Sequence, residues 1–231
     1  MEFKKSYFDS GREYNRQKGL YSIRDNLPAQ GLFSKKSKQH HNLLLLDKWK
    51  LLKGCKKVLD AGCGKGEFME LNPYKAEIYG IDINKETVIE AKEKGLNIQF
   101  ADVNRKLPFT DSSFDGINCS HVLEHLEDAT NAISEFKRIL KDKGILVISV
   151  PNFSFKKFYA DYTHKRPYPK EALFRILNDN GFREIKIING VCLNQLVSAI
   201  FLLFPKIRFS AEKFFGIFCP WEIIAIARNK K

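Results

Sequence analysis

Glycines and a carboxylate alternate in one short stretch of the chain, and their spacing suits ligand binding. Leu59-Asp-Ala-Gly-Cys-Gly-Lys-Gly66 ends a short apolar run with an acid and then three alternating glycines. Glycine has no Cβ, so a glycine-rich backbone can turn sharply and approach a ligand closely. Asp60 can accept hydrogen bonds from ligand donors or from loop amides. The dinucleotide-binding fingerprint is G-x-G-x-x-G, whereas this stretch reads D-x-G-x-G-x-G, a tighter form.

Two further acids close two further predicted strands. Asp82 ends a strand predicted at residues 76–82, and Asp102 follows one predicted at residues 97–101. An acid about 20 residues after a glycine loop can accept hydrogen bonds from both hydroxyls of a ribose. A third carboxylate can accept a hydrogen bond from the amino group of adenine. Because ligands of open parallel sheets bind beyond the carboxyl ends of the strands, the three acids predict a nucleoside-containing ligand at that edge.

Two histidines are candidates for a general base. His121 stands at the predicted end of the fourth strand, and His164 lies in a polar and aromatic segment. Imidazole has an unperturbed pKa that suits proton removal near neutral pH. Residues 121–125 also match H-x-x-E-H, the zinc-binding pattern of inverted zinc peptidases. Because this match directly follows a strand of the predicted sheet, we do not expect a peptidase.

The elements that position these residues alternate between strand and helix. Buried strands read as short apolar runs, and the helices between them have apolar faces at helical spacing. This alternation predicts an α/β fold of the Rossmann-like, doubly wound type: a mainly parallel seven-stranded sheet covered on both faces, with an N-terminal helical arm. The strands are expected at residues 57–61, 76–82, 97–101, 116–120, 145–150, 185–188 and 221–227.

The chain is expected to form an N-terminal cap and one larger domain. Residues 1–54 are expected to form an arm, with a mobile basic loop near residues 31–37 and a helix at 40–52. Residues 55–231 are expected to form the ligand-binding domain, with an apolar insert at about 191–220. The insert is too short to span a bilayer. We expect it to form packed helices, a lid over an apolar substrate, a homodimer face or a peripheral membrane contact.

Charge is unevenly distributed along the 231 residues, whose formal net charge is +12. Residues 1–57 hold 14 Lys and Arg against 5 Asp and Glu, residues 58–150 hold 11 against 16, and residues 151–231 hold 14 against 6. Basic flanks suit nucleic acid, an anionic membrane surface or an acidic small substrate, and equally a solubilising surface. The five cysteines form no C-x-x-C pair, which argues against a disulfide framework and a zinc site. With no signal peptide recognised, the expected location is the cytoplasm, with peripheral membrane contact as an option.

The motifs together resemble those of the class I S-adenosylmethionine (SAM)-dependent methyltransferases, in the small-molecule branch of that family. The resemblance covers roughly residues 55–190 and rests on residues 59–66, 80–84, 101–103, 107–115, 120–126 and 138–144. It implies SAM as the cofactor. It also implies the binding residues: the loop of Asp60, Gly62, Cys63, Gly64 and Gly66 along the methionine moiety, Asp82 on the ribose, Ile83 and Val103 flanking adenine, Asp102 at its amino group, and Ser120 beneath the sulfonium.

The resemblance extends to an acceptor loop but not to a metal. Residues 161–168 resemble D-x-x-H-x-R-x-Y, a substrate-side loop of many relatives, so Asp161, Arg166 and Tyr168 are expected to line the acceptor pocket beside His164. Some quinone-pathway methyltransferases resemble residues 121–125 with E-x-x-E-H and use a divalent metal there. This chain has His121 at the first position, and we assign no metal.

The expected activity is methyl transfer to an oxygen or nitrogen of a small or lipid- or sugar-linked acceptor, with His164 and His121 as the catalytic candidates. The aromatic loop and the apolar insert favour an amphipathic acceptor. RNA methylation through the basic arm is an alternative. It is disfavoured because the fourth strand ends in Cys-Ser-His rather than N/D-P-P-Y/F, and we expect no DNA partner. A SAM-binding partner without turnover is the third hypothesis.

Overall fold

The computed structural model describes residues 30–152, 158–159, 161–190 and 222–231, with side chains from residue 41 onward. The chain divides into two units, residues 1–44 and 45–231. Helix α3 (Gln30–Leu51) crosses this boundary. Residues 1–29 of the arm expected at 1–54, and the apolar insert expected at about 191–220, lie outside the described residues.

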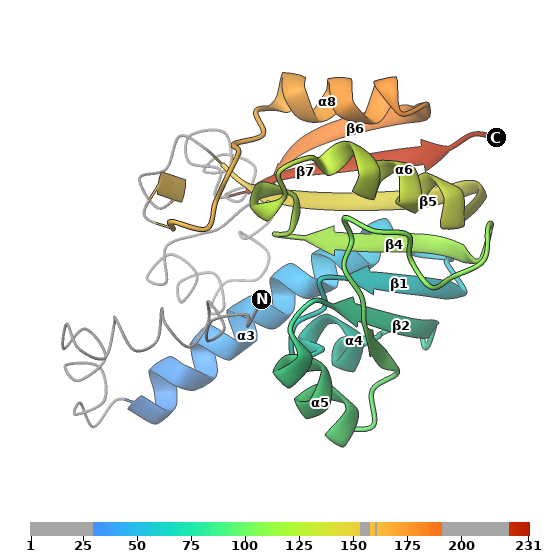
Figure 1. The fold of residues 1–231 in the computed structure, drawn as a ribbon. Helices are drawn as coiled ribbons and strands as arrows, with labels where there is room; N and C mark the ends of the chain where they lie inside the picture. The colour runs from blue at the N-terminus through green and yellow to red at the C-terminus, as the bar shows by residue number, and fades with distance from the viewer. Residues whose placement is uncertain (1–29, 153–157, 160, 191–221) are drawn as a thin grey trace. The chain divides into compact units, whose positions relative to one another are not determined.

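The second unit is built around one seven-stranded sheet with the order β3-β2-β1-β4-β5-β7-β6. Strands β1 to β5 pair in parallel, whereas β7 is antiparallel to both of its neighbours. Figure 1 shows β7 running against β5. The order reverses at β1 and β4, so the α/β, mainly parallel prediction is confirmed. The strands are β1 Lys57–Ala61, β2 Glu77–Asp82, β3 Ile98–Phe100, β4 Phe114–Ser120, β5 Leu140–Pro151, β6 Phe182–Gly190 and β7 Glu222–Asn229.

Short helices connect the strands, and two of them begin at a side-chain cap. Asn84 accepts a hydrogen bond from the Thr87 amide at the start of α5, and Asp128 accepts one from the Thr130 amide at the start of α6. Such caps satisfy amides that have no partner within the helix. The helices between the strands are α4 Glu67–Leu71, α5 Lys85–Glu93, the 3-10 helix η1 Leu123–His125, α6 Ala129–Ile139 and α8 Lys170–Asp179.

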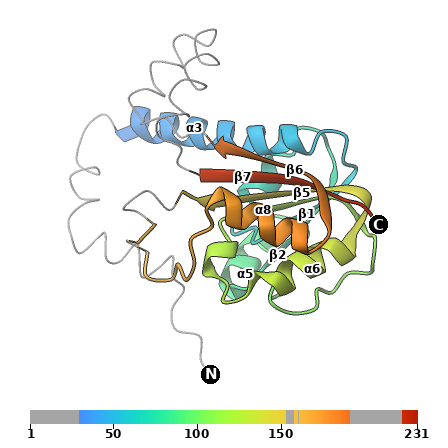
Figure 2. The same cartoon turned by 90° about the horizontal axis from the view of Figure 1, so that it is seen from above.

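Alternate residues of the strands supply the two faces of the sheet. Leu59 and Leu146 belong to the larger apolar cluster, which includes side chains of α6 and α8. Val58 and Val147 belong to a second cluster, with Trp49 of α3. Figure 2 shows α6 and α8 together on one side of the sheet. Apolar side chains therefore cover both faces, which places the polar ligand-binding groups at the strand ends.

Helix α3 begins earlier than the sequence pattern predicts. It starts at Gln30 rather than near residue 40, so the segment 31–37, expected as a mobile basic loop, is helical. The prediction was wrong because residues 31–38 show no apolar period, although the lysines and the leucine among them favour helix. Among the described residues, no helix combines the length and the apolar character that crossing a membrane requires.

Candidate active site

The glycine loop between β1 and α4 has the conformation that only glycine adopts easily. Gly62, Gly64 and Gly66 have φ of 77°, 52° and 84°. A Cβ on Gly62 would clash with Val122 Cγ2, whereas a Cβ on Gly64 would meet nothing within 4 Å. The loop is therefore packed against protein at Gly62 and Gly66 and open at Gly64, where a ligand can approach the backbone.

Asp82, the last residue of β2, is held at the opening of this loop. Its Oδ2 accepts a hydrogen bond from the Gly64 amide at 2.9 Å, and its Oδ1 accepts one from the Asn84 amide at 2.8 Å. Each carboxylate oxygen keeps a further lone pair, so it can also accept from a ligand hydroxyl. Ile83, the next residue, leaves 49% of its surface exposed. An acceptor and an apolar platform thus stand side by side at the strand end.

The third acid of the predicted set shapes the turn after β3. Oδ1 of Asp102 accepts hydrogen bonds from the backbone and side-chain nitrogens of Asn104, at 2.9 and 3.0 Å. Its Oδ2 lies 3.6 Å from Arg105 Nε. Val103 is buried in the larger core cluster. The roles of Asp102 and Val103 toward an adenine ring stay predictions.

Polar side chains form a line from β1 to the end of β4. Asn118 Nδ2 donates to Asp60 Oδ1 at 2.7 Å, and Ser120 Oγ donates to Asn118 Oδ1 at 3.1 Å. Burial raises the pKa of Asp60 to about 7, against the opposing effects of the Asn118 hydrogen bond and the Lys48 ammonium. Sequence reasoning missed Asn118, although a lone amide inside an apolar strand was visible there.

His121 turns the chain from β4 into η1 and lies between two acids. It is not a glycine, yet its φ is 55°. Its Nε2 is 3.1 Å from Glu222 Oε2, and its Nδ1 is 3.4 Å from Glu124 Oε1. Burial lowers the pKa of His121, but the two carboxylates outweigh that effect and raise it to about 9. The imidazole therefore holds its proton at neutral pH and, in this arrangement, is a charge partner rather than a base.

A buried lysine completes this charge network. Lys48 Nζ of α3 lies 3.2 Å from Glu222 Oε2, and both side chains are almost fully buried. Burial raises the pKa of Glu222, but the positive charges of Lys48 and His121 have the larger, opposite effect and bring the pKa down to about 2. Sequence reasoning missed this pair. Its only sign was one lysine among the apolar residues of a helix and one acid at the start of an apolar strand.

The thiol inside the glycine loop is not activated. Cys63 is buried, and burial raises its pKa well above the ordinary value, with the carboxylates of Asp60 and Asp82 acting in the same direction. Because the thiolate is the reactive form, Cys63 serves as a small apolar loop residue. Its amide and that of Gly62 donate to the Ile81 carbonyl, at 3.0 and 2.8 Å.

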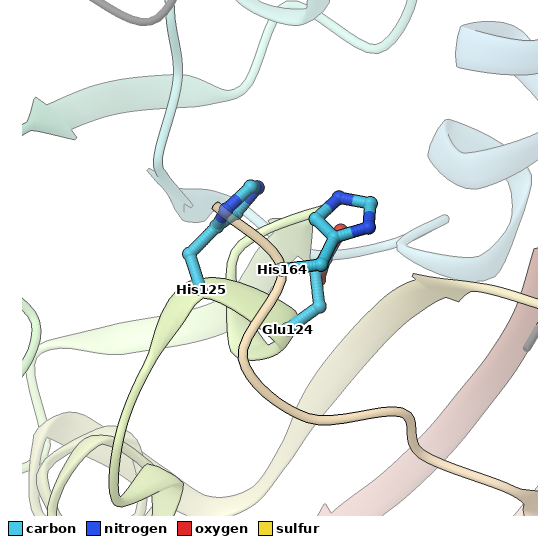
Figure 3. A group of neighbouring side chains, drawn as sticks. All are labelled: Glu124, His125 and His164. Carbon is cyan, nitrogen blue, oxygen red and sulfur yellow. The ribbon is translucent and has the colours of Figure 1, made fainter. Parts of the chain in front are cut away.

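The loop that precedes α8 brings Asp161 and His164 together. His164 Nε2 lies 3.5 Å from Asp161 Oδ2, and Nδ1 lies 2.9 Å from the Phe158 carbonyl oxygen. The loop is fixed to η1 because the Lys165 amide donates to the Glu124 carbonyl oxygen at 2.7 Å. As Figure 3 shows, His164 thereby faces Glu124 and His125 of η1.

The other two predicted acceptor residues, Arg166 and Tyr168, differ from each other in exposure. Tyr168 belongs to the larger apolar cluster and is buried, and burial raises its pKa against the opposing effect of Arg166. Arg166 is exposed. Their contact with an acceptor stays a prediction. His121 also lies at a strand end rather than on a helix with His125, so residues 121–125 lack the helical geometry of the H-x-x-E-H peptidase site.

Comparison with known proteins identifies the family of the chain. Residues 59–148 match a family model described as a methyltransferase domain. A SAM-dependent methyltransferase of known structure from Archaeoglobus fulgidus is 31% identical, with a TM-score of 0.65 over 81% of this chain and 92% of that chain. The chain belongs to the class I SAM-dependent methyltransferase family.

Curated relatives align with this methyltransferase chain over part of their length. An uncharacterized protein of Methanocaldococcus jannaschii is 34% identical over 137 residues, which are 55% of this chain and 65% of that protein. The ubiquinone biosynthesis O-methyltransferase of Histophilus somni is 33% identical over 112 residues, 44% of this chain and 47% of that enzyme. The chain therefore matches about half to two thirds of the length of these two relatives.

The residues of the methyltransferase site fit SAM, the cofactor of the family. The backbone at Gly64 is open where a Cβ would protrude. Asp82 presents a carboxylate beside the exposed Ile83, an arrangement that suits a ribose and the edge of an adenine ring. Asp60 and Ser120 end the line of polar groups under the loop. These residues would hold the cofactor, and SAM supplies a methyl group on a sulfonium, which is electrophilic.

Proposed function

We propose that this methyltransferase transfers the methyl group of SAM to an oxygen or nitrogen of a small, amphipathic acceptor. The observation that carries the proposal is the position of the Asp161–His164 pair beside the cofactor edge. Ser120 ends β4, His121 follows it, and His121 Nδ1 is 3.4 Å from Glu124. One ligand atom each of Glu124, His125 and His164 lies within 4.8 Å of the others. A polar acceptor pocket next to the loop is what the reaction requires.

Methyl transfer has three requirements that these residues would meet. Transfer between a sulfonium and a nucleophile is an in-line displacement, so the nucleophile must be aligned and water excluded. A hydroxyl acceptor must also lose its proton. His164 suits that last task because the Phe158 carbonyl accepts from its Nδ1, which leaves the Nε2 lone pair for a proton. Asp161 beside Nε2 would stabilise the charge that forms. His121 already holds a proton and would contribute charge.

Two features support an amphipathic acceptor. Tyr159 and Tyr162, on either side of Asp161, leave 70% and 81% of their surfaces exposed. Exposed aromatic side chains on a functional loop suit a ligand with an apolar part. The Histophilus relative is a ubiquinone biosynthesis O-methyltransferase, which favours an oxygen acceptor over a nitrogen acceptor. The lipid- or sugar-linked class expected from the sequence is consistent with both.

The test is to incubate the protein with methyl-labelled SAM and separated fractions of a cell extract. We expect label in a lipid, quinone or glycan fraction and none in RNA. An Asp82→Ala variant should label less at low SAM concentration because it lacks the ribose acceptor. Label found only in RNA would contradict the acceptor class.

A second arm tests for turnover itself. If the protein binds SAM but labels no fraction, it is a SAM-binding partner without activity and the proposal fails. His164→Gln keeps the polar character of the side chain but removes the base. General bases contribute about 10²- to 10⁴-fold, so turnover should fall by about that factor while SAM affinity stays unchanged. Equal turnover in His164→Gln and the unaltered protein would remove His164 from the mechanism.

A further inference from the structure

We propose that the amino-terminal edge of the parallel strands binds a compact polyanion, a di- or triphosphate chain that is free or attached to a small molecule. A hollow of about 690 Å³ lies at this edge, and we call it the basic hollow. Six of its lining side chains are cationic and three are anionic. The cations are Lys53, Lys56, Lys57, Lys141, Lys143 and Arg228. Because a cleft with an excess of one charge concentrates ions of the opposite charge, this lining favours an anionic ligand.

Half of these cations are paired within the protein. The pairs are Lys141 with Asp115 at 2.8 Å, Lys57 with Glu77 at 3.6 Å and Arg228 with Glu184 at 3.1 Å. The other carboxylate oxygen of Asp115 accepts a hydrogen bond from the Lys57 amide at 2.8 Å. Asp142, the remaining acid of the basic hollow, accepts one from the Lys231 amide at 3.1 Å. The acids are therefore engaged, and the excess positive charge belongs to the other three cations.

Lys53, Lys56 and Lys143 supply the charge that a ligand would neutralise. All three residues are exposed. Among the described residues, no ion pair or hydrogen bond engages the ammonium groups of these lysines. Each ammonium is a compact charge with three hydrogen-bond donors, which suits the oxygens of a phosphate. A chain of linked phosphates could thus satisfy several ammonium groups at once.

The backbone between the first two of these lysines is open to a ligand. Gly54 lines the basic hollow, has a φ of 90°, and would carry a Cβ with nothing within 4 Å of it. Its amide donates no hydrogen bond to the part of the chain that the structure describes. An anion can therefore approach this amide as well as the ammonium groups on either side of it.

The lining of the basic hollow favours a compact ligand over a nucleic-acid strand. None of the described residues that line it is aromatic, whereas proteins that bind single strands commonly stack the bases on aromatic side chains. Lys53 and Lys56 follow α3, and Lys143 belongs to β5. Two segments that are far apart in the sequence thus line the same hollow, where one phosphate chain can contact both.

The basic hollow is separate from the cofactor edge. Strand β1 runs from Lys57, in the lining of the hollow, to Ala61, next to the glycine loop. At about 3.3 Å per residue, the two ends of this strand are about 13 Å apart. Figure 1 shows the arrows of β1 and β4 pointing away from the edge with the hollow. Exposed charges are largely screened beyond about 8–10 Å at physiological salt, so an anion here would bind independently of SAM and of the methyl acceptor.

The experiment is a calorimetric titration of the full chain with inorganic triphosphate, without SAM or acceptor. We expect one ion per chain and an affinity that falls as salt is added. An exposed ion pair contributes a factor of up to about five. Lys143→Gln should therefore weaken binding about two- to fivefold, and Lys53→Gln with Lys56→Gln about 4- to 25-fold. The matched control is Lys92→Gln with Lys170→Gln, which removes the same charge from exposed positions outside the hollow and should leave binding unchanged.

A second titration, with ATP at saturating SAM, distinguishes the two sources of the phosphate chain. An affinity no higher than that of inorganic triphosphate would indicate a free ligand, and a higher affinity that depends on Lys53 and Lys56 would indicate an attached one. Either result supports the site. Three results would overturn it: no saturable binding of inorganic triphosphate or ATP, an equal loss of affinity in the control variant, or tighter binding of a single-stranded RNA oligonucleotide than of either. Far-UV circular dichroism checks that each variant folds.

Discussion

At neutral pH Asp60 stands near the midpoint of its titration, because burial raises its pKa to about 7. The unfolded chain would titrate this group near the ordinary value of about 3.9. Between these two values the folded protein holds a proton that the unfolded chain has lost. The contribution of Asp60 to stability is therefore fully present below about pH 4, falls as pH rises, and levels off above about pH 7.

Asp60→Asn should remove this pH dependence. The amide is neutral at every pH and its oxygen can still accept from Asn118. Between about pH 5 and about pH 8, the unaltered protein should lose on the order of 2–3 kcal/mol of unfolding free energy relative to the variant. Urea unfolding without SAM, at both pH values, measures the difference. Parallel pH curves for the two proteins would show that Asp60 titrates normally.

Candidate site residues could be recognised in the sequence where they stand at the end of a predicted strand. Asp60, Asp82 and Ser120 were found in the sequence because each closes an apolar run. Glu222 could not be found in the same way, because its partner His121 lies 101 residues away in the sequence. A side-chain pair of that separation exists only after β7 has been inserted beside β5. The base role predicted for His121 also depended on this unseen partner.

At the scale of elements, comparing a glycine of the glycine loop with a glycine elsewhere distinguishes the effect of a Cβ on stability from its effect on SAM binding. Gly64 and Gly54 both have positive φ, and at both a Cβ would meet nothing within 4 Å. Only Gly64 lies in the cofactor loop.

Gly64→Ala and Gly54→Ala should therefore cost about the same stability, roughly 1 kcal/mol for a left-handed residue with a Cβ. Only Gly64→Ala should weaken SAM binding, because its methyl group would occupy the space that the cofactor needs. Thermal unfolding and calorimetry with SAM measure the two effects. Equal SAM affinity in both variants would mean that the cofactor does not approach Gly64.

The Lys48–Glu222 pair connects α3 to β7 and should show the behaviour of a buried ion pair. Glu222→Gln leaves Lys48 buried without its counter-charge, which costs about 3–5 kcal/mol. Lys48→Met together with Glu222→Gln removes both charges and should recover most of that loss. Urea unfolding of the single and double variants gives the coupling.

The exposed pair Lys65–Glu90 provides the control. Glu90→Gln should change stability by less than about 1 kcal/mol. Additive losses in the Lys48 and Glu222 variants would contradict the coupling.

At the scale of the whole molecule, the alternation of strands and helices was enough to predict a mainly parallel sheet. Strand β7 confirms the apolar run expected at residues 221–227. The start of α3 was not predictable, because residues 31–38 have no apolar period and mix the helix formers leucine and lysine with glycine and serine. Tyr168 was expected to line the acceptor pocket, but its side chain belongs to the larger core cluster. The sequence could not decide this, because an aromatic ring in a loop segment can contact a ligand or pack in the core.

Basic side chains gather at the opposite edge of the sheet from the cofactor loop. They line a hollow of about 690 Å³ at the amino ends of the parallel strands, with Lys53, Lys56 and Lys141 among its residues. Interactions between exposed charges are screened beyond about 8–10 Å at physiological salt.

Lys53→Glu with Lys56→Glu should therefore leave SAM affinity and acceptor labelling within about twofold of the unaltered protein. Calorimetry with SAM measures the affinity, and the labelled-SAM assay measures the labelling. A loss of labelling confined to RNA would instead connect this edge to a nucleic-acid substrate.

The central claim is that SAM binds at the glycine loop with its ribose on Asp82. Calorimetric titration with SAM, comparing the unaltered protein with Asp82→Ala and with the exposed control Asp179→Ala, tests it most directly. Hydrogen bonds to a charged group contribute about 1.5–3 kcal/mol, so Asp82→Ala should weaken SAM binding at least about tenfold while Asp179→Ala leaves it unchanged. An Asp82→Ala variant that folds and binds SAM with unchanged affinity would contradict the account.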